Sequence, residues 1–368
     1  MKRENLVSIL DKAKKKYYSE GESDLSDAEY DAIEDELREI DPSNEFLKSI
    51  ESKSESIWPK AKHDIPMGSL NKVQNEEQFE DWIKSLADIP NDLFVTQKLD
   101  GLSVEVKYVD GKLTQAITRG NGFIGDDITK NVLKMKGVKK NLGEDFTGSL
   151  RGEIVLFKST WKEHFDDTKN PRNTAVGTTK RLDGFGCEML TVLFYEAIGN
   201  LRFMHQDELF RFLKRVGLKT PYGERLKIDD VPVNVKCAHL ERNKIDYDID
   251  GLVVRINDIE LFKKLGETNQ RPKGAMAYKF PHEEKVTQIE SISWQVGKTG
   301  RITPVANLKL VEIGGITVKR ATLHNAKNVL NLGVSLGSTV VVSRRNDVIP
   351  YIEKVLLNGE QAVGIPDN

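Results

Sequence analysis

The spacing of apolar and polar residues divides the chain into three parts of different texture. Up to about residue 60, apolar residues recur every three or four positions, which predicts helices. From 61 to 284, short β-branched runs alternate with helical ones, as is typical of an α+β domain. From 285 to 368, short apolar runs are separated by Gly and Asn, which predicts a small all-β barrel.

Some elements within these parts have recognisable limits. Ser26 and Glu29 form a capping box, and a polar linker is predicted at 52–62. The helix after the capping box carries an apolar stripe of Tyr30, Ile33, Leu37 and Ile40. The strand-like runs of the barrel are Ile302–Val305, Ile316–Val318, Thr339–Ser343 and Ile349–Val355. The predicted architecture is therefore α+β and multidomain, with a helical domain at 1–60, an α+β domain at 61–284 and a β-barrel at 285–368.

Composition excludes several classes of protein. The 368 residues are 30% charged and 38% hydrophobic, which is an ordinary soluble composition. No apolar stretch is long enough to span a bilayer, and the first residues lead into an amphipathic helix, not a signal peptide. The two cysteines, Cys187 and Cys237, form no C-x-x-C zinc motif and favour a reducing, cytoplasmic location. With a net charge of −2, any nucleic acid must be held by local basic patches.

The segment Lys98-Leu99-Asp100-Gly101 carries the most chemical information. It ends an apolar run at 93–95, and a second strand-like run follows at 102–106. Lys98 and Asp100 have the same parity and would project from one face of a strand. A lysine held there can act as a nucleophile once its neutral form is favoured, and the carboxylate could bind a ribose hydroxyl or orient the amine. The alternative is a hairpin with solvated charges.

Two glycine-containing segments follow. Residues 120–125 match G-x-G-x-x-G, but Asp126-Asp127 come next, which disfavours a pyrophosphate site of the Rossmann kind. We expect a tight polar loop with Arg119 at its start. Arg151-Gly152-Glu153 precedes another strand-like run at 154–157, and Glu153 would face Lys98 if both lay in one sheet.

Further motifs occur in a definite order: Asn170-Pro171-Arg172-Asn173-Thr174-Ala175-Val176-Gly177, Asp248-Ile249-Asp250-Gly251-Leu252-Val253-Val254-Arg255 and Ala277-Tyr278-Lys279-Phe280-Pro281. Together with Lys98-Leu99-Asp100-Gly101 and Arg151-Gly152-Glu153, this series resembles the nucleotidyltransferase motifs of bacterial-type NAD⁺-dependent DNA ligases. Tyr17-Tyr18 and residues 27–31 resemble that family's nicotinamide-recognition domain, and residues 295–306 with 321–325 resemble its OB-fold. The resemblance covers essentially the whole chain.

The resemblance implies a three-step reaction on nicked duplex DNA. Lys98 would take AMP from NAD⁺ as a phosphoramidate, pass it to the 5′-phosphate of the nick, and the 3′-hydroxyl would then displace it. The implied catalytic residues are Lys98, Asp100, Glu153, Arg172, Asp250 and Lys279. Mg²⁺ or Mn²⁺ is implied as the metal, with Asp250 as a ligand, and no zinc site is expected.

The resemblance also implies the ligand contacts. The nicotinamide half of NAD⁺ would contact Tyr17, Tyr18, Asp27, Tyr30 and Asp31, although Tyr30 could equally belong to a helix core. The remainder of the NAD⁺ site would be Ser69, Leu70, Arg119, Glu153, Arg255 and Lys279. DNA would contact Lys180, Lys298, Arg301, Lys319, Arg320, Arg344 and Arg345, or these would form a solvated surface.

The chain departs from the family pattern at three positions. Thr96 stands where glutamate is usual, Arg255 where lysine is usual, and Lys180 where arginine is usual. Arginine and lysine differ in geometry and donor count, so neither exchange is conservative at a phosphate site. Asp250 and Arg255 also have opposite parity, and a β-bulge or a strong twist would be needed for both to reach one ligand.

The family would continue beyond residue 368 into a zinc-binding module, helix-hairpin-helix repeats and a BRCT domain. Three explanations fit a sequence that ends at residue 368. It could be a natural short form, one subunit of a split enzyme with a separate partner chain, or a shortened chain. We expect a monomer. Two alternative functions remain: an ATP- or GTP-using nucleotidyltransferase of the RNA-ligase or capping type, and a non-sealing subunit that binds DNA ends.

Overall fold

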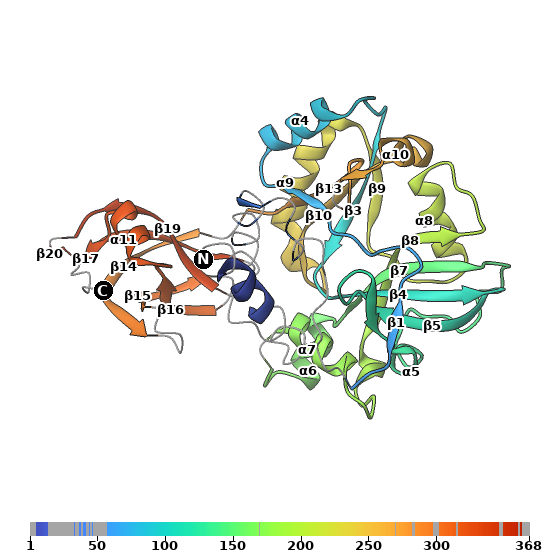
Figure 1. Cartoon of the computed structure of the whole chain (residues 1–368), viewed down its shortest axis with the longest axis horizontal. Coiled ribbons are helices and arrows are strands. Elements are labelled where there is room, and N and C mark those ends of the chain that lie inside the picture. Colours follow the sequence, from blue (N-terminus) through green and yellow to red (C-terminus); the bar gives the residue numbers. More distant parts are fainter. Residues whose placement is uncertain are drawn as a thin grey trace. The chain divides into compact units, whose positions relative to one another are not determined.

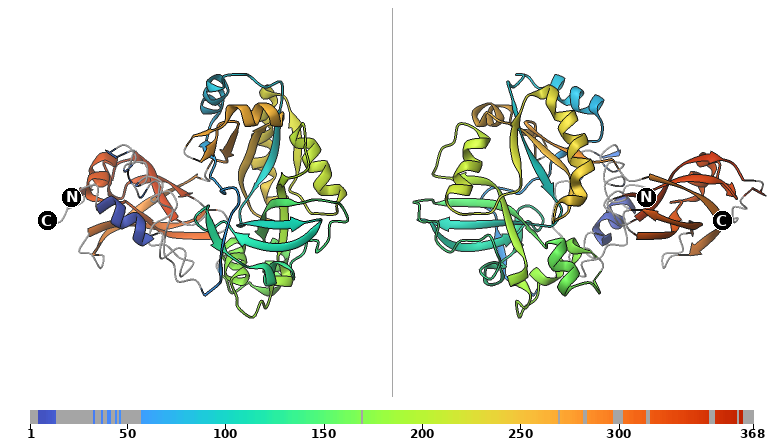
Figure 2. Two further views of the ribbon diagram at one scale, coloured as in Figure 1. Left: turned by 45° about the vertical axis from the view of Figure 1, so that its right-hand side comes forward. Right: turned by 180° about the vertical axis from the view of Figure 1, so that it is seen from behind.

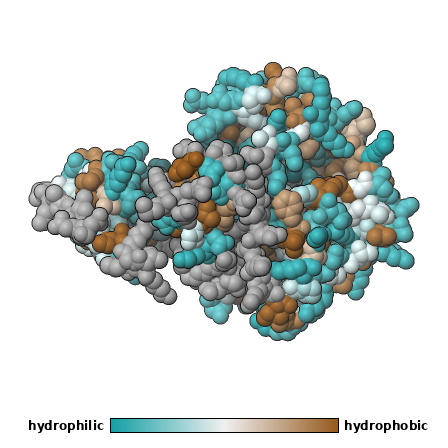
Figure 3. Space-filling view, in the orientation of Figure 1, coloured by the Kyte–Doolittle hydropathy of each residue, from teal (hydrophilic) through white to brown (hydrophobic). Residues whose placement is uncertain are grey.

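The computed structural model describes residues 5–13, 33, 37, 40–41, 44, 46 and 57–362, apart from 169, 269, 282–283, 297–301, 314–315, 346–348 and 360. Two compact units are present: Met1–Ser23 with Asp41–Phe280, and Asp24–Ile40 with Pro281–Asn368 (Figure 1). Where apolar residues are exposed on the face in Figure 3, they are scattered among hydrophilic ones. None of the described helices has the length and apolar character of a membrane span.

Few residues of the predicted helical domain at 1–60 are described. Residues 5–13 are helical, with Leu6 and Leu10 buried. Of the predicted stripe, Ile33, Leu37 and Ile40 have helical backbones, and Leu37 is buried whereas Ile40 is exposed. Tyr30 and the capping box at residues 26–29 lie outside the described residues. The helical domain stays a prediction.

The first unit contains two larger sheets, whose strands run in different directions in Figures 1 and 2, and two two-stranded sheets, β1 with β6 and β11 with β12. A five-stranded sheet has the order β2 (Asn71–Val73), β13 (Ala275–Lys279), β10 (Ile249–Ile256), β3 (Leu93–Leu99) and β9 (Gly223–Leu226). A four-stranded sheet has the order β5 (Lys112–Thr118), β4 (Leu102–Val109), β7 (Gly148–Val155) and β8 (Thr191–Gly199). β2 and β13 pair in parallel, and the other neighbours in these sheets are antiparallel.

Helices and short elements complete this unit. The α-helices are α4 (Glu76–Ser85), α5 (Thr129–Val132), α6 (Lys158–His164), α7 (Pro171–Thr179), α8 (Gln206–Arg215), α9 (Val231–Glu241) and α10 (Ile259–Leu265). The 3₁₀ helices are η1 (Cys187–Met189), η2 (Ile228–Asp230) and η3 (Arg242–Lys244). The short strands are β1 (Lys60–Lys62), β6 (Ile124–Asp126), β11 (Glu267–Thr268) and β12 (Arg271–Pro272).

Each sheet has its own core, and alternation along β3 decides which side chains enter it. Leu93, Val95 and Leu99 pack into the core that α4 and α9 share with the five-stranded sheet. Thr96 and Lys98 have the opposite parity and lie on the other face. The second core lies on the four-stranded sheet and includes residues of α8. The nucleophile candidate is therefore outside both cores.

The structure corrects the predicted relation between the lysine and glutamate motifs. β3 and β4 are neither a hairpin nor partners in one sheet, because the chain crosses from one sheet to the other at Asp100 and Gly101. A Cβ at Gly101 would lie 2.2 Å from the Ile154 carbonyl oxygen, so only glycine permits this close crossing. Glu153 is not on a shared sheet with Lys98, and it lies inside β7, not ahead of a strand.

Two other local predictions have clear outcomes. The C-terminal part of the predicted polar linker is wrong, because Trp58 is buried and Lys60–Lys62 pair with Ile124–Asp126. The glycine loop at 120–125 leads into β6, not into a helix, so the Rossmann interpretation fails as the sequence indicated.

The C-terminal unit contains the predicted barrel. Its closed order is β14 (Glu284–Val296), β15 (Ile302–Ile313), β16 (Ile316–Thr322), β19 (Ile349–Leu357) and β18 (Thr339–Arg345). Smaller elements are α11 (Ala326–Leu332), β17 (Ser335–Leu336) and β20 (Gln361–Ala362). Buried residues such as Ile289, Leu308, Val340 and Ile352 fill the interior. The barrel prediction is confirmed, although the sequence pattern did not predict β14 or α11.

Candidate functional site

Two lysines flank a glycine in one row across the five-stranded sheet. Lys98 of β3 and Lys279 of β13 both pair with Gly251 of β10, so all three lie on the same face. A Cβ at Gly251 would lie 2.3 Å from the Tyr278 carbonyl oxygen. Only glycine therefore permits this close approach of β10 to the backbone of β13.

A β-bulge brings Asp250 into this row. The register of β10 against β3 shifts between Ile249 and Gly251, so Asp250 is the inserted residue. Its carboxylate lies 2.9 Å from Lys98 Nζ and 3.2 Å from Lys279 Nζ. Of the two irregularities that the sequence offered to reconcile the parity of Asp250 and Arg255, a bulge or a strong twist, the structure has the bulge.

The helix α7 brings a guanidinium group to the same place. Asn170 caps α7, because its side chain accepts a 2.8 Å hydrogen bond from the Asn173 N–H, and Pro171 occupies the first turn. Arg172 follows and lies 3.2 Å from the Asp100 carboxylate. Burial raises the pKa of Asp100 to about 6, although the charge of Arg172 opposes this.

Glu153 approaches from the other sheet. Its side chain is buried and accepts a 2.8 Å hydrogen bond from the Ser103 hydroxyl. Burial raises the pKa of Glu153 to about 7, although the Ser103 hydrogen bond and the charges of Lys98, Arg119 and Arg172 oppose it. The two sheets therefore contribute to one group of interacting charges.

The three departures from the family pattern have distinct surroundings. Thr96 is buried, pairs with Val253 and has the same parity as Lys98. Arg255 donates a 2.9 Å hydrogen bond to Glu196 of β8, so it links the two sheets. Lys180 lies 3.7 Å from Asp126, a carboxylate that also contacts Lys60.

The structure describes only some of the other residues that were predicted to contact NAD⁺ or DNA. Ser69 is exposed and Leu70 half-buried, just before β2, which pairs with β13. Lys319 and Arg320 are exposed on β16. Arg344 and Arg345 lie in β18, but their side chains are outside the described residues. Wholly outside the described residues are Tyr17, Tyr18, Asp27, Tyr30, Asp31, Lys298 and Arg301.

Sequence reasoning missed a buried polar cluster beside this site. The buried side chains of His63 and Glu105 are in contact, and Arg151 and Arg255 share the carboxylate of Glu196. Glu105 lies within the apolar run at 102–106, so a charge in a buried strand was the available signal.

The described side chains fit a phosphate better than a metal ion. Both oxygen atoms of Asp250 face lysine ammonium groups, which a divalent cation would have to displace. Within the described part of the chain, no group of three or more His, Cys, Asp or Glu side chains is placed to hold a metal ion. Mg²⁺ or Mn²⁺ therefore stays a prediction from the resemblance.

The fold and the site define an adenylation domain followed by an OB-fold domain. Residues 55–283 match the family model of the NAD-dependent DNA ligase adenylation domain, and residues 286–363 match that of the NAD-dependent DNA ligase OB-fold domain. The chain belongs to the NAD-dependent DNA ligase family.

Curated relatives agree with this family. A DNA ligase of Sorangium cellulosum is 42% identical over 96% of this chain and 56% of its own length. A DNA ligase of Treponema denticola is 34% identical over 97% of this chain and 58% of its own length. A DNA ligase of Treponema pallidum is 35% identical over 93% of this chain and 43% of its own length. The chain thus spans about half the length of the curated relatives it matches.

Proposed function

We propose that the chain is an NAD⁺-dependent DNA ligase that seals nicks through a lysyl-AMP intermediate. The observation that carries this proposal is the row of Lys98, Asp250 and Lys279 inside a domain that matches the family's adenylation domain. The chain spans about half the length of the curated relatives it matches, so nick sealing by this chain alone is part of the proposal.

Lys98 would perform the first step. Its amine attacks the α-phosphorus of NAD⁺, a phosphorus–nitrogen bond forms, and the bond to the bridging oxygen breaks, so nicotinamide mononucleotide leaves with the electron pair. Lys98 must first lose a proton, and the Asp250 carboxylate, 3.0 Å away, is positioned to receive it. Lys279 and Arg172 would neutralise the charge that develops on the phosphate.

The carboxyl groups on either side would hold the adenosine. Asp100 is tied to Arg172, and Glu153 to Ser103, so each has a fixed orientation. A carboxyl group with a raised pKa can both donate and accept hydrogen bonds near neutral pH, which suits a ribose hydroxyl. Ser69, Leu70, Arg119 and Arg255 would complete this part of the NAD⁺ site.

The remaining parts of the chain would bind the nicotinamide half of NAD⁺ and the nicked DNA. The N-terminal helical domain would bind the nicotinamide half of NAD⁺ through Tyr17, Tyr18, Asp27, Tyr30 and Asp31. Nicked duplex DNA would bind through phosphates to Lys180 and to the barrel residues Lys298, Arg301, Lys319, Arg320, Arg344 and Arg345. We also propose a magnesium- or manganese-requiring cytoplasmic monomer, with domains at 1–60, 61–284 and 285–368.

Labelling of the protein by NAD⁺ tests the proposal directly. The full chain is incubated with NAD⁺ or ATP carrying labelled adenylate, resolved on a denaturing gel and then given nicked duplex DNA. Label should enter from NAD⁺ only, disappear in Lys98→Ala and persist in the control Lys264→Ala, whose side chain is exposed on α10.

The outcomes separate the alternatives. Labelling by ATP instead of NAD⁺ would favour an ATP-using nucleotidyltransferase. Labelling without transfer to the nick would favour a subunit that needs a separate chain for sealing. Labelling that survives in Lys98→Ala would show that the nucleophile is wrongly assigned.

A further inference from the structure

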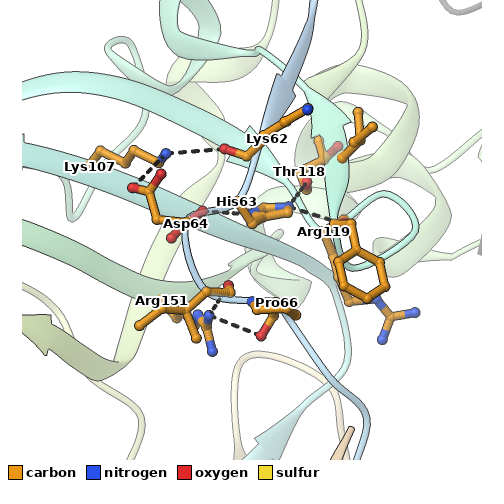
Figure 4. A network of polar contacts seen from close by, with 12 residues as sticks. Lys62, His63, Asp64, Pro66, Lys107, Thr118, Arg119 and Arg151 are labelled. Atoms are coloured by element: carbon orange, nitrogen blue, oxygen red, sulfur yellow. Dashed lines mark hydrogen bonds and ion pairs between the residues drawn. The ribbon is translucent and has the colours of Figure 1, made fainter.

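A buried histidine lies beneath the loop that carries Arg119. His63 follows β1, and its ring lies between Glu105 of β4 and the end of β5 (Figure 4). Its Nδ1 contacts the Glu105 carboxylate. Its Nε2 lies 3.1 Å from the Thr118 carbonyl oxygen and 3.2 Å from the Arg119 carbonyl oxygen. The side chains of His63 and Glu105 are 0% and 1% exposed.

These partners decide which hydrogen bonds the ring can make. A carbonyl oxygen only accepts hydrogen bonds, and an ionised carboxylate likewise only accepts, so both ring nitrogens of His63 must donate. Burial alone would raise the pKa of Glu105, but hydrogen bonds from His63 and Ser149 outweigh burial and hold it below its ordinary value. Both ring nitrogens of His63 therefore face hydrogen-bond acceptors.

The segment that carries His63 is attached on two sides. Its backbone donates from His63 to the Phe123 carbonyl oxygen at 2.9 Å and from Met67 to that of Gly122 at 2.8 Å. On the other side, Arg151 of β7 donates to the carbonyl oxygens of Ile65 at 2.5 Å and Pro66 at 3.2 Å. Figure 4 shows Arg151 and His63 on the two sides of this segment.

The attachments connect two parts of the proposed NAD⁺ site. Arg119, whose main-chain carbonyl accepts from His63, carries a charge that acts on Glu153. Ser69 and Leu70 follow the same segment a few residues later. A buried ring fixed between Glu105 and the Arg119 carbonyl therefore holds both parts in one arrangement.

We propose that His63 is a positioning residue for the adenylate half of NAD⁺, holding Arg119 and the segment to Leu70 in place through hydrogen bonds that both of its ring nitrogens donate. This inference rests on the proposed function. The ring is buried and makes its contacts to Glu105 and two main-chain carbonyls, so it acts through these groups and not on the reacting atoms. Its loss should weaken NAD⁺ binding more than the chemical step.

Initial rates of labelling by NAD⁺ test this inference in the full chain. His63→Gln keeps the approximate size of the side chain but replaces the two ring nitrogens by one donor group and one acceptor, so the KM for NAD⁺ should rise about tenfold or more while kcat changes little. Glu105→Gln should raise the KM in the same direction. The matched control is Asp64→Asn, which breaks an exposed pair with Lys107 on the same segment and should change neither constant.

A second measurement reports the ring directly. The long-range ¹H–¹⁵N spectrum of the wild-type chain should show both ring nitrogens of His63 protonated at pH 7.5, and Glu105→Gln should abolish this state or make it depend on pH. This readout does not require that His63→Gln folds. A neutral ring in the wild type would overturn the proposal.

The remaining outcomes distinguish the inference from the function on which it rests. A wild type that NAD⁺ does not label would overturn both. A labelled wild type with an unchanged KM in folded His63→Gln and Glu105→Gln would overturn only the role of His63. A loss of kcat equal to the loss of folded protein would show that His63 is merely structural.

Discussion

The carboxyl groups near Lys98 have pKa values that move in opposite directions. Burial would raise the pKa of Asp250, but the charges of Lys98 and Lys279 outweigh it and keep the pKa below its ordinary value. Burial prevails at Asp100, whose pKa is about 6, and at Glu153, whose pKa is about 7. At neutral pH, Asp250 therefore stays ionised beside the lysines while Glu153 is partly protonated.

The raised pKa of Glu153 makes stability depend on pH in a defined sense. Its pKa rises from 4.5 to about 7 on folding, so the folded chain binds this proton more tightly than the unfolded chain. The stabilisation is complete below pH 4.5 and is lost as the pH rises to about 7, by at most about 1.4 kcal/mol per pH unit. Glu153→Gln removes this dependence.

Denaturant unfolding between pH 5 and 8 checks this prediction. Relative to the wild type, Glu153→Gln should gain stability as the pH rises, and it should level off above about pH 7. Asp100 shifts in the same direction and contributes to both proteins, so the difference isolates Glu153. The control Glu80→Gln, exposed on α4, should differ from the wild type by a constant amount. Parallel curves for Glu153→Gln would contradict the assignment.

The helix α7 shows how one element determines the position of a site residue. Asn170 caps α7, and Arg172 stands two residues later, next to Asp100. Asn75 caps α4 in the same way, with a 2.9 Å hydrogen bond from the Gln78 N–H, but α4 carries none of the site residues. Asn75 and Asn170 are therefore equivalent helix N-caps, one on a helix without site residues and one on a helix that carries Arg172.

Both cap substitutions should cost similar stability but differ in activity. Asn170→Ala and Asn75→Ala should each destabilise the fold by about 1 kcal/mol, because each leaves an N–H of the first turn unpaired. Only Asn170→Ala should slow labelling by NAD⁺, since only α7 positions Arg172. Unfolding curves and initial labelling rates check the two effects. Equal slowing in both variants would show that the effect comes from stability alone.

The strands β8 and β10 are joined by a shared carboxylate. Glu196 of β8 accepts hydrogen bonds from Arg255 of β10 at 2.9 Å and from Arg151 of β7 at 3.3 Å. Burial would raise the pKa of Glu196, but the two guanidinium groups outweigh it and keep the carboxylate ionised. An arginine at position 255 therefore has a structural partner between the sheets, whatever contact it makes with a ligand.

Removing this shared carboxylate should be more damaging than restoring the usual lysine. Glu196→Gln leaves two partly buried guanidinium groups without an anion and should destabilise the fold by about 3 kcal/mol. Arg255→Lys keeps a positive charge near Glu196 and should cost about 1 kcal/mol. Thermal unfolding checks the order. Asp183→Asn, which breaks an exposed pair with Arg181, is the control and should have no measurable effect.

The sequence predicted the local elements well but not how they associate. The runs at 93–95 and 102–106 became β3 and β4, yet nothing in them indicated that they belong to different sheets. The reason is that β3 pairs with β10, about 150 residues further along, and single-sequence periodicity carries no information on such pairing.

Long-range pairing also limits what the sequence could predict about the candidate site. Opposite parity of Asp250 and Arg255 indicated that a β-bulge or a strong twist would be needed for both to reach one ligand, and the structure has a bulge at Asp250. The partner of Glu105 could not be found, because His63 lies 42 residues earlier, just beyond the predicted polar linker at 52–62. Long-range polar pairs between a strand and a loop have no periodic signature.

At the scale of the whole molecule, the net charge is slightly negative, whereas the proposed DNA-binding barrel carries exposed cations. A chain with a net charge of −2 does not attract DNA as a whole, so phosphate binding must be local. On β16, Val318 and Ala321 are buried while Lys319 and Arg320 are both exposed. The alternation is broken where the register of β16 against β15 shifts, between the pairs of Asn307 and Val311. This irregularity presents two adjacent cations on the outside of the barrel.

These two cations should contribute directly to the salt dependence of nick binding. Each phosphate contact releases counterions and adds about 0.9 to the slope of log affinity against log salt. Lys319→Ala with Arg320→Ala should therefore weaken binding to nicked duplex and reduce this slope by up to about 1.8, while labelling by NAD⁺ stays intact. The control Lys263→Ala with Lys264→Ala removes the same two charges from α10 and takes the net charge from −2 to −4. If the control reduced the slope as much, total charge and not the barrel surface would govern DNA binding.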